Sequence, residues 1–150
     1  MDDKVKRLIE YINDPSIVKS VHDEVVVKRG TLKDSCAAFL STMLIRAGFP
    51  QSYGTWAESE ATELKNEGWR VVEAAYNGHP GDVFVCGDLN GNGATDHVGF
   101  VLKMDRPGFF WAVDNRADLM GEDKRYIRNI DGVKPRTPVK YWLRFGEQEG

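Results

Sequence analysis

Hydrophobic residues recur at the spacing of an α-helix in two segments of the first half of the chain. One segment predicts a helix over residues 5–12, which ends before Pro15 because the residue preceding a proline disfavours the helical conformation. The other pattern is the most regular in the sequence and predicts a helix over residues 35–47. Its apolar stripe consists of Cys36, Phe39, Leu40, Met43, Leu44 and Ala47.

A third helix is predicted over residues 56–66. Thr55 is its expected N-cap, Glu58 supplies the acid of a capping box, and Gly68 ends the helix. The valine run at 25–27 is too short to assign and leads into a predicted loop.

After Gly68 the pattern changes to short runs rich in β-branched and aromatic residues, separated by turn-forming residues. Strands are predicted over 69–72, 83–86, 97–103, 109–114, 126–130 and 139–145. An order of helices followed by strands is typical of α+β proteins, in which helices cover one face of an antiparallel sheet. The 150 residues contain no repeat, linker or biased tract, so we expect a single domain over residues 1–150.

Composition and charge narrow the classes of function. The net charge of -3, from 20 Lys+Arg and 23 Asp+Glu, argues against a nucleic-acid or anionic-membrane surface. We expect no membrane span, because no apolar run approaches the roughly 18–20 residues that one requires. The polar N-terminal residues do not resemble a signal peptide, and two unpaired thiols fit synthesis in a reducing cytoplasm.

Cys36 is the first candidate for chemistry. It lies in the first turn of the predicted helix 35–47, where unpaired backbone N–H groups and the helix dipole favour a thiolate. Such a cysteine can be a nucleophile. The alternative is a buried structural cysteine, which is common.

His97 and the end of the following strand supply candidate partners for Cys36. His97 begins a predicted strand and can act as a general base at a cleft rim, or it can be a core histidine bonded to backbone. In an antiparallel hairpin, Asp114 or Asn115 would lie next to His97 and hold its ring. Adjacent strand residues point to opposite faces, so only one of them can do so. Asp114 is favoured, with Asn115 as the alternate.

Three short segments carry a resemblance to a known family. Residues 34–39 (DSCAAF), 80–85 (PGDVFV) and 96–101 (DHVGFV) resemble the nucleophile helix, the P-G-D strand and the D-H-V-G strand of CHAP and NlpC/P60 peptidoglycan hydrolases. The resemblance spans about residues 33–115 in the family's order. It implies a papain-like fold, with N-terminal helices packed on an antiparallel sheet of about five to six strands.

The resemblance also implies an activity. A cysteine peptidase or amidase would hydrolyse an amide bond of bacterial peptidoglycan through Cys36, His97 and Asp114 or Asn115, with an acyl-enzyme intermediate. The resemblance fits both an endopeptidase and an N-acetylmuramoyl-L-alanine amidase. It also fits two biological settings, a phage endolysin and a secreted antibacterial effector with a cognate immunity protein. In both settings the enzyme would act in the periplasm or on the cell wall. We expect a monomer. The alternative is a non-catalytic, calcium-stabilised binding domain on the same scaffold.

Residues 88–96 match part of a calcium-binding loop. Asp88, Asn90, Asn92 and Asp96 fall at ligand positions 1, 3, 5 and 9 of an EF-hand-type loop, with glycine at position 6. Gly99 replaces the bidentate glutamate of position 12, which predicts weak affinity for a structural Ca²⁺. The alternative is a hairpin turn rich in glycine and asparagine. No cofactor is expected for the chemistry itself.

Several other residues have less specific patterns. His22 and His79 lie in polar segments and are expected to be exposed. Cys86 is expected to be a small buried hydrophobe. Tyr53 and Trp56 are core residues by default, although either could line a substrate groove.

Overall fold

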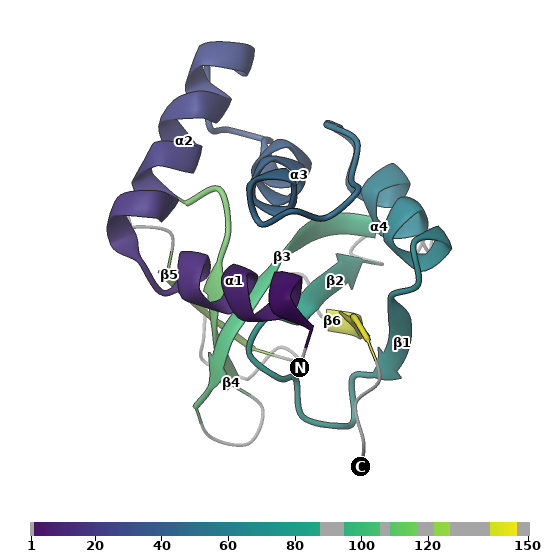
Figure 1. Ribbon diagram of the computed structural model, residues 1–150. Helices are drawn as coiled ribbons and strands as arrows, with labels where there is room; N and C mark the ends of the chain where they lie inside the picture. The colour runs from purple at the N-terminus through teal and green to yellow at the C-terminus, as the bar shows by residue number, and fades with distance from the viewer. Residues whose placement is uncertain (1, 88–94, 106–108, 117–121, 127–138, 147–150) are drawn as a thin grey trace.

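A computed structural model describes residues 2–87, 95–105, 109–116, 122–126 and 139–146 of the chain. Within these ranges the chain is an α+β protein in which helices precede strands, as the sequence predicts (Figure 1). The helices are α1 (Asp3–Ile12), α2 (Pro15–Arg29), α3 (Cys36–Arg46) and α4 (Ala57–Asn66). No helix in the described part of the chain is long and apolar enough to cross a membrane.

The strands form one sheet in which every pair of neighbours is antiparallel. Their order across the sheet is β1-β6-β2-β3-β4-β5. The strands are β1 (Arg70–Glu73), β2 (Val83–Gly87), β3 (Thr95–Met104), β4 (Phe109–Val113), β5 (Glu122–Tyr126) and β6 (Val139–Arg144). β5 overlaps the predicted strand over 126–130 at a single residue, and 127–130 lie outside the described residues.

Helix α2 corrects the sequence analysis, which left residues 25–27 unassigned and expected a loop to follow. Asp14 is the N-cap of α2 and accepts a hydrogen bond from the N–H of Ser16, while Pro15 occupies the first turn. Asp14-Pro15 therefore starts α2, since proline suits a position whose N–H would have no helical partner. Gly30 ends α2 with a φ of 79°.

The predicted capping box of α4 is also wrong. Trp56, not Thr55, is the N-cap, and the helix starts at Ala57. Glu58 instead accepts a hydrogen bond from the backbone N–H of Thr95, at 2.8 Å. This bond ties α4 to the first residue of β3.

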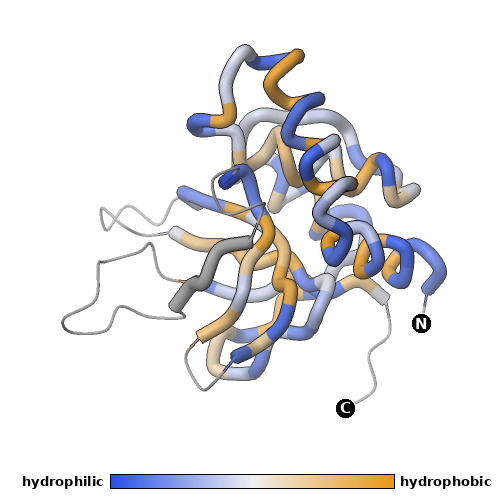
Figure 2. Tube along the Cα trace, turned by 90° about the vertical axis from the view of Figure 1, so that its left-hand side faces the viewer, coloured by the Kyte–Doolittle hydropathy of each residue, from blue (hydrophilic) through white to orange (hydrophobic). Residues whose placement is uncertain are grey.

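The hydrophobic core lies on both faces of the sheet. The larger cluster packs α1, α2, α3 and α4 against one face and includes Phe39, Met43, Val98 and Phe100. A smaller cluster on the opposite face contains Phe84, Phe110 and Trp142. Hydrophobic segments therefore run along the central strands, as Figure 2 shows.

Candidate active site

The N-terminus of α3 places Cys36 against β3. Cys36 is the first residue of α3, and the side chain of His97 and the backbone groups of Val98 and Ala37 act on its thiol. The preceding residue, Ser35, is held by Arg29 of α2, whose Nε donates to the Ser35 hydroxyl at 3.0 Å. The segment leading into the helix is thereby fixed from α2.

His97 lies near the start of β3, paired with Cys86 of β2 just before an irregularity in the strand register. Its Nε2 is 3.0 Å from Oδ2 of Asp114, and its side chain is 20% exposed. Because Nε2 faces Asp114, Nδ1 is the ring nitrogen left for the thiol of Cys36. The imidazole thus stands between a thiol and a carboxylate.

The structure distinguishes Asp114 from Asn115 as the residue that holds the His97 ring. The side chain of Asp114 is fully buried beside His97, and its Oδ1 accepts the backbone N–H of Arg116 at 3.0 Å. Asn115 is oriented differently, and its Nδ2 donates to the carbonyl of Leu32 at 2.8 Å. Among the described residues, Asn115 Oδ1 has no hydrogen-bond partner. Asp114 is thus hydrogen-bonded to His97, whereas Asn115 braces the loop before Cys36.

These contacts favour the charged forms of both Cys36 and His97. Burial raises the pKa of the Cys36 thiol, but the hydrogen bond and charge of His97, with the backbone donors, outweigh burial and lower the pKa overall. Burial likewise lowers the pKa of His97, yet Asp114 and Cys36 outweigh it and raise the pKa to about 9. The pair therefore favours a thiolate next to an imidazolium.

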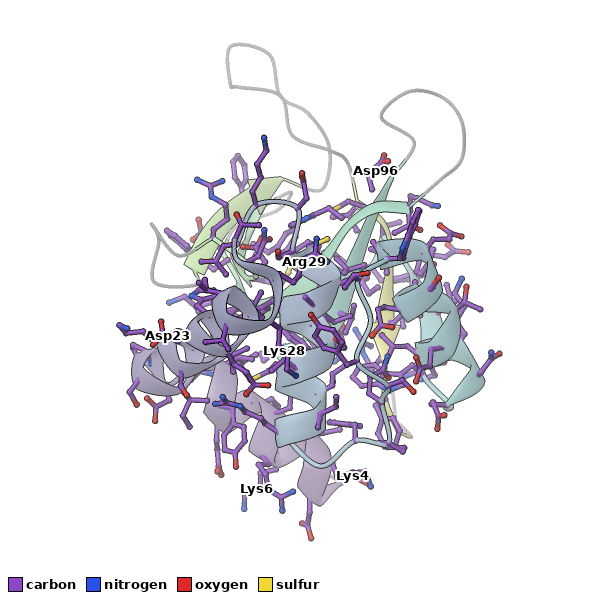
Figure 3. The ribbon with its side chains drawn as sticks, turned by 90° about the horizontal axis from the view of Figure 1, so that it is seen from above. Lys4, Lys6, Asp23, Lys28, Arg29 and Asp96 are labelled. Carbon is purple, nitrogen blue, oxygen red and sulfur yellow. The ribbon has the colours of Figure 1, made fainter. Side chains whose placement is uncertain are left out.

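An open crevice of about 310 Å³ lies over this pair. Cys36 and His97 line it together with Asp34, Trp56, Asp96 and Asn115. Trp56 is 74% exposed, so the default expectation of a core position is wrong for this residue. Figure 3 shows Asp96, near the start of β3, on the opposite side of the view from Lys4 and Lys6.

Two larger hollows lie away from the crevice. They measure about 500 and 360 Å³, and His79 and Arg144 border both. Arg144 is paired with the buried carboxylate of Asp82, at 2.7 Å between Nη2 and Oδ2. Cys36 borders neither hollow, whereas Cys36 and His97 both line the smaller crevice.

The expected calcium ligands fall mostly outside the described residues, since Asp88, Asn90 and Asn92 lie in the segment 88–94. Asp96 is described, within β3. Among the described residues there is no group of three or more His, Cys, Asp or Glu side chains that could hold a metal ion. Calcium binding therefore stays a prediction.

His22 is a residue of the site that sequence reasoning missed. It was expected to be exposed but is only 4% exposed, and its Nε2 lies 2.7 Å from the backbone carbonyl oxygen of Asp114. The signal was present in the sequence, because Val18, Val21 and Val25 share the buried stripe of α2 with His22. The sequence analysis missed this stripe because it interpreted Asp14-Pro15 only as the end of a helix.

Comparison with known protein families finds no family that matches this chain, and no curated protein matches it. Function is therefore inferred from the arrangement around Cys36.

Proposed function

We propose that the protein is a cysteine hydrolase of the papain-like class, with Cys36 as nucleophile, His97 as general base and acid, and Asp114 as the residue that orients the imidazole. One observation carries this proposal. The His97 ring is hydrogen-bonded to the buried Asp114 carboxylate and acts on the Cys36 thiol, and Cys36 and His97 both line an open crevice. A structural cysteine needs neither a charged partner nor access to solvent.

The chemistry follows from the positions of these groups. The Cys36 thiolate attacks the carbonyl carbon of an amide, and the oxyanion that forms can be stabilised by the backbone N–H of Cys36. The His97 imidazolium donates the Nδ1 proton to the departing amine, which leaves a thioester on Cys36. Water then attacks the thioester, and His97 accepts a proton from that water. The carboxylic acid is released, and Cys36 and His97 return to the thiolate and imidazolium forms.

Peptidoglycan peptide is the substrate that we propose, on the strength of the family resemblance. Two of the resembling motifs have clear physical roles here. Asp82, from the P-G-D segment, accepts the backbone N–H of His79 and pairs with Arg144, which fixes the turn before β2. Gly99, from the D-H-V-G segment, leaves room beside Asp114. Both residues thus support the strands that carry the site.

The biological setting is proposed on the same basis. The enzyme would act as a monomer on the cell wall or in the periplasm, either as a phage endolysin or as an antibacterial effector countered by an immunity protein. The bond cleaved would be within the wall peptide or at the junction between sugar and peptide. A bound Ca²⁺ would order the segment before β3 and have no part in the chemistry.

Digestion of purified peptidoglycan tests the proposal. The wild-type protein is expected to release muropeptides whose masses identify the bond cleaved, and Cys36→Ala is expected to release none while melting at the wild-type temperature. Cys86→Ala is the matched control, because it removes the other cysteine from a buried position in β2. Equal release by wild type and Cys36→Ala would contradict the proposal. Binding without cleavage by the wild type would favour the non-catalytic alternative.

A further inference from the structure

His22 occupies a position between the helix that carries Cys36 and the strand that leads to Asp114. It lies on α2, and its ring centroid is 5.0 Å from that of Phe39, which follows Cys36 by about one turn of α3. On its other side, Nε2 lies 2.7 Å from the carbonyl oxygen of Asp114. His22 is therefore packed against one catalytic element and hydrogen-bonded to the next.

The chemistry of this contact fixes where the proton of His22 lies. A carbonyl oxygen only accepts hydrogen bonds, so Nε2 of His22 must carry a hydrogen and donate it. The bond is short and is buried together with both residues. Leaving a buried polar group without its partner is unfavourable, so this bond restrains the position of Asp114.

Asp114 needs such a restraint because it follows the last residue of β4. Val113 is paired with Phe100 and with Glu122 at the end of the two strand ladders. Beyond that point, the Asp114 carboxylate is oriented by the N–H of Arg116 at Oδ1, and Oδ2 faces His97. His22 holds the backbone of the same residue from the helical layer.

We propose that His22 is a positioning residue of the site, donating from Nε2 to the Asp114 carbonyl and so holding the Asp114 carboxylate against His97. The catalytic consequence rests on the proposed function. If Asp114 moves away, the His97 imidazolium loses its carboxylate partner and the Cys36 thiolate becomes less favourable. The effect of His22 therefore reaches Cys36 through Asp114 and His97.

Two substitutions distinguish hydrogen bonding from simple filling of space. His22→Phe keeps an aromatic ring against Phe39 and removes the donor. His22→Gln keeps an N–H donor of similar reach and removes the ring. His79→Phe is the matched control, because His79 is a half-buried histidine that borders the two hollows away from Cys36.

The readout is the pH dependence of Cys36 alkylation by iodoacetamide, followed by mass spectrometry of the peptide that contains Cys36. For His22→Phe we expect the acid limb of the profile to move up by about one pH unit. The kcat on peptidoglycan should fall about tenfold with little change in KM. His22→Gln and His79→Phe should keep the wild-type profile. A wild-type profile in a folded His22→Phe, or an equal shift in His22→Phe and His22→Gln, would overturn the proposal.

The two proposals fail in distinguishable ways. A shifted alkylation profile in His22→Phe without any peptidoglycan cleavage by the wild type would support the role of His22 and reject the proposed substrate. An ordinary thiol profile in the wild type would overturn both proposals. Should His22→Phe fail to fold, ¹H–¹⁵N spectra of the wild-type imidazoles decide the question. A hydrogen on Nε2 of His22 is expected, and an Nε2 without one would overturn the proposal.

Discussion

Gly99 gives Asp114 the space in which its carboxylate reaches His97. A Cβ atom added at Gly99 would lie 3.0 Å from Cβ of Asp114 and 2.6 Å from Cζ of Phe84. Real Cβ atoms essentially never come within 3.0 Å of another heavy atom, so Phe84 would have to move, and Asp114 would be crowded as well. The glycine of the DHVG segment is thus explained by packing beside the site.

Gly99→Ala should therefore damage the site as well as the fold. We expect a loss of about 1–3 kcal/mol in the free energy of unfolding, as for other insertions into a packed core. Displacement of Asp114 should also shift the Cys36 alkylation profile toward that of an ordinary thiol. Urea unfolding and alkylation kinetics measure the two effects separately. Wild-type values in both would contradict this account of Gly99.

The Asp82–Arg144 pair should contribute to stability without affecting the chemistry. Asp82→Asn leaves the charge of the buried Arg144 unpaired, so we expect a loss of about 3–5 kcal/mol. Asp23→Asn is the control, because the Lys19–Asp23 pair on α2 is exposed and should contribute less than about 1 kcal/mol. Under native conditions both variants should keep the wild-type alkylation profile of Cys36. A shifted profile in a folded Asp82→Asn would contradict this prediction.

Glu60 should make the stability depend on pH. Its carboxyl is buried on α4 and accepts a hydrogen bond from Gln51, and burial, with the nearby charge of Glu63, raises the pKa of Glu60 to about 7. Between the ordinary value of 4.5 and about 7 the folded state holds a proton that the unfolded state has released. The stability that the protonated Glu60 contributes to the folded state is therefore fully present below pH 4.5, and it is lost as the pH rises through about 7.

Glu60→Gln should remove this pH dependence. At pH 8 we expect the variant to be more stable than the wild type by up to about 3 kcal/mol, since Gln needs no proton to remain neutral. Glu67→Gln, at the exposed end of α4, is the control and should change little. Denaturation curves at pH 5 and pH 8 test the prediction. A wild type that becomes more stable over this range relative to Glu60→Gln would contradict it.

Calcium removal tests the prediction that concerns residues 88–96. If Asp88, Asn90, Asn92 and Asp96 hold Ca²⁺, addition of EGTA should lower the melting temperature, and excess Ca²⁺ should restore it. Asp88→Asn should weaken the response to calcium. Equal melting temperatures in EGTA and in Ca²⁺ would indicate that the segment is a turn only.

The sequence predicted the helix that begins with Cys36 and most of the strands, because strong hydrophobic periodicity reports local structure directly. It did not predict α2, since Asp14-Pro15 is compatible with a helix end and with a helix start. Neither could it decide between Asp114 and Asn115. That choice depends on the register of β3 against β4, which shifts between Val101 and Lys103. The contact of His22 with Asp114 joins residues 92 positions apart and required the tertiary structure.

The pH profile of Cys36 alkylation tests the central claim, a thiolate paired with imidazolium, most directly. Because the pKa of Cys36 is lowered and that of His97 is raised to about 9, the thiolate–imidazolium pair should exist at neutral pH. We predict that Cys36 reacts with iodoacetamide well below pH 8, and that hydrolysis falls as the pH rises through about 9 and His97 loses its proton. His97→Ala should return Cys36 to the profile of an ordinary thiol. Identical profiles for wild type and His97→Ala, both rising only above pH 8, would contradict the account.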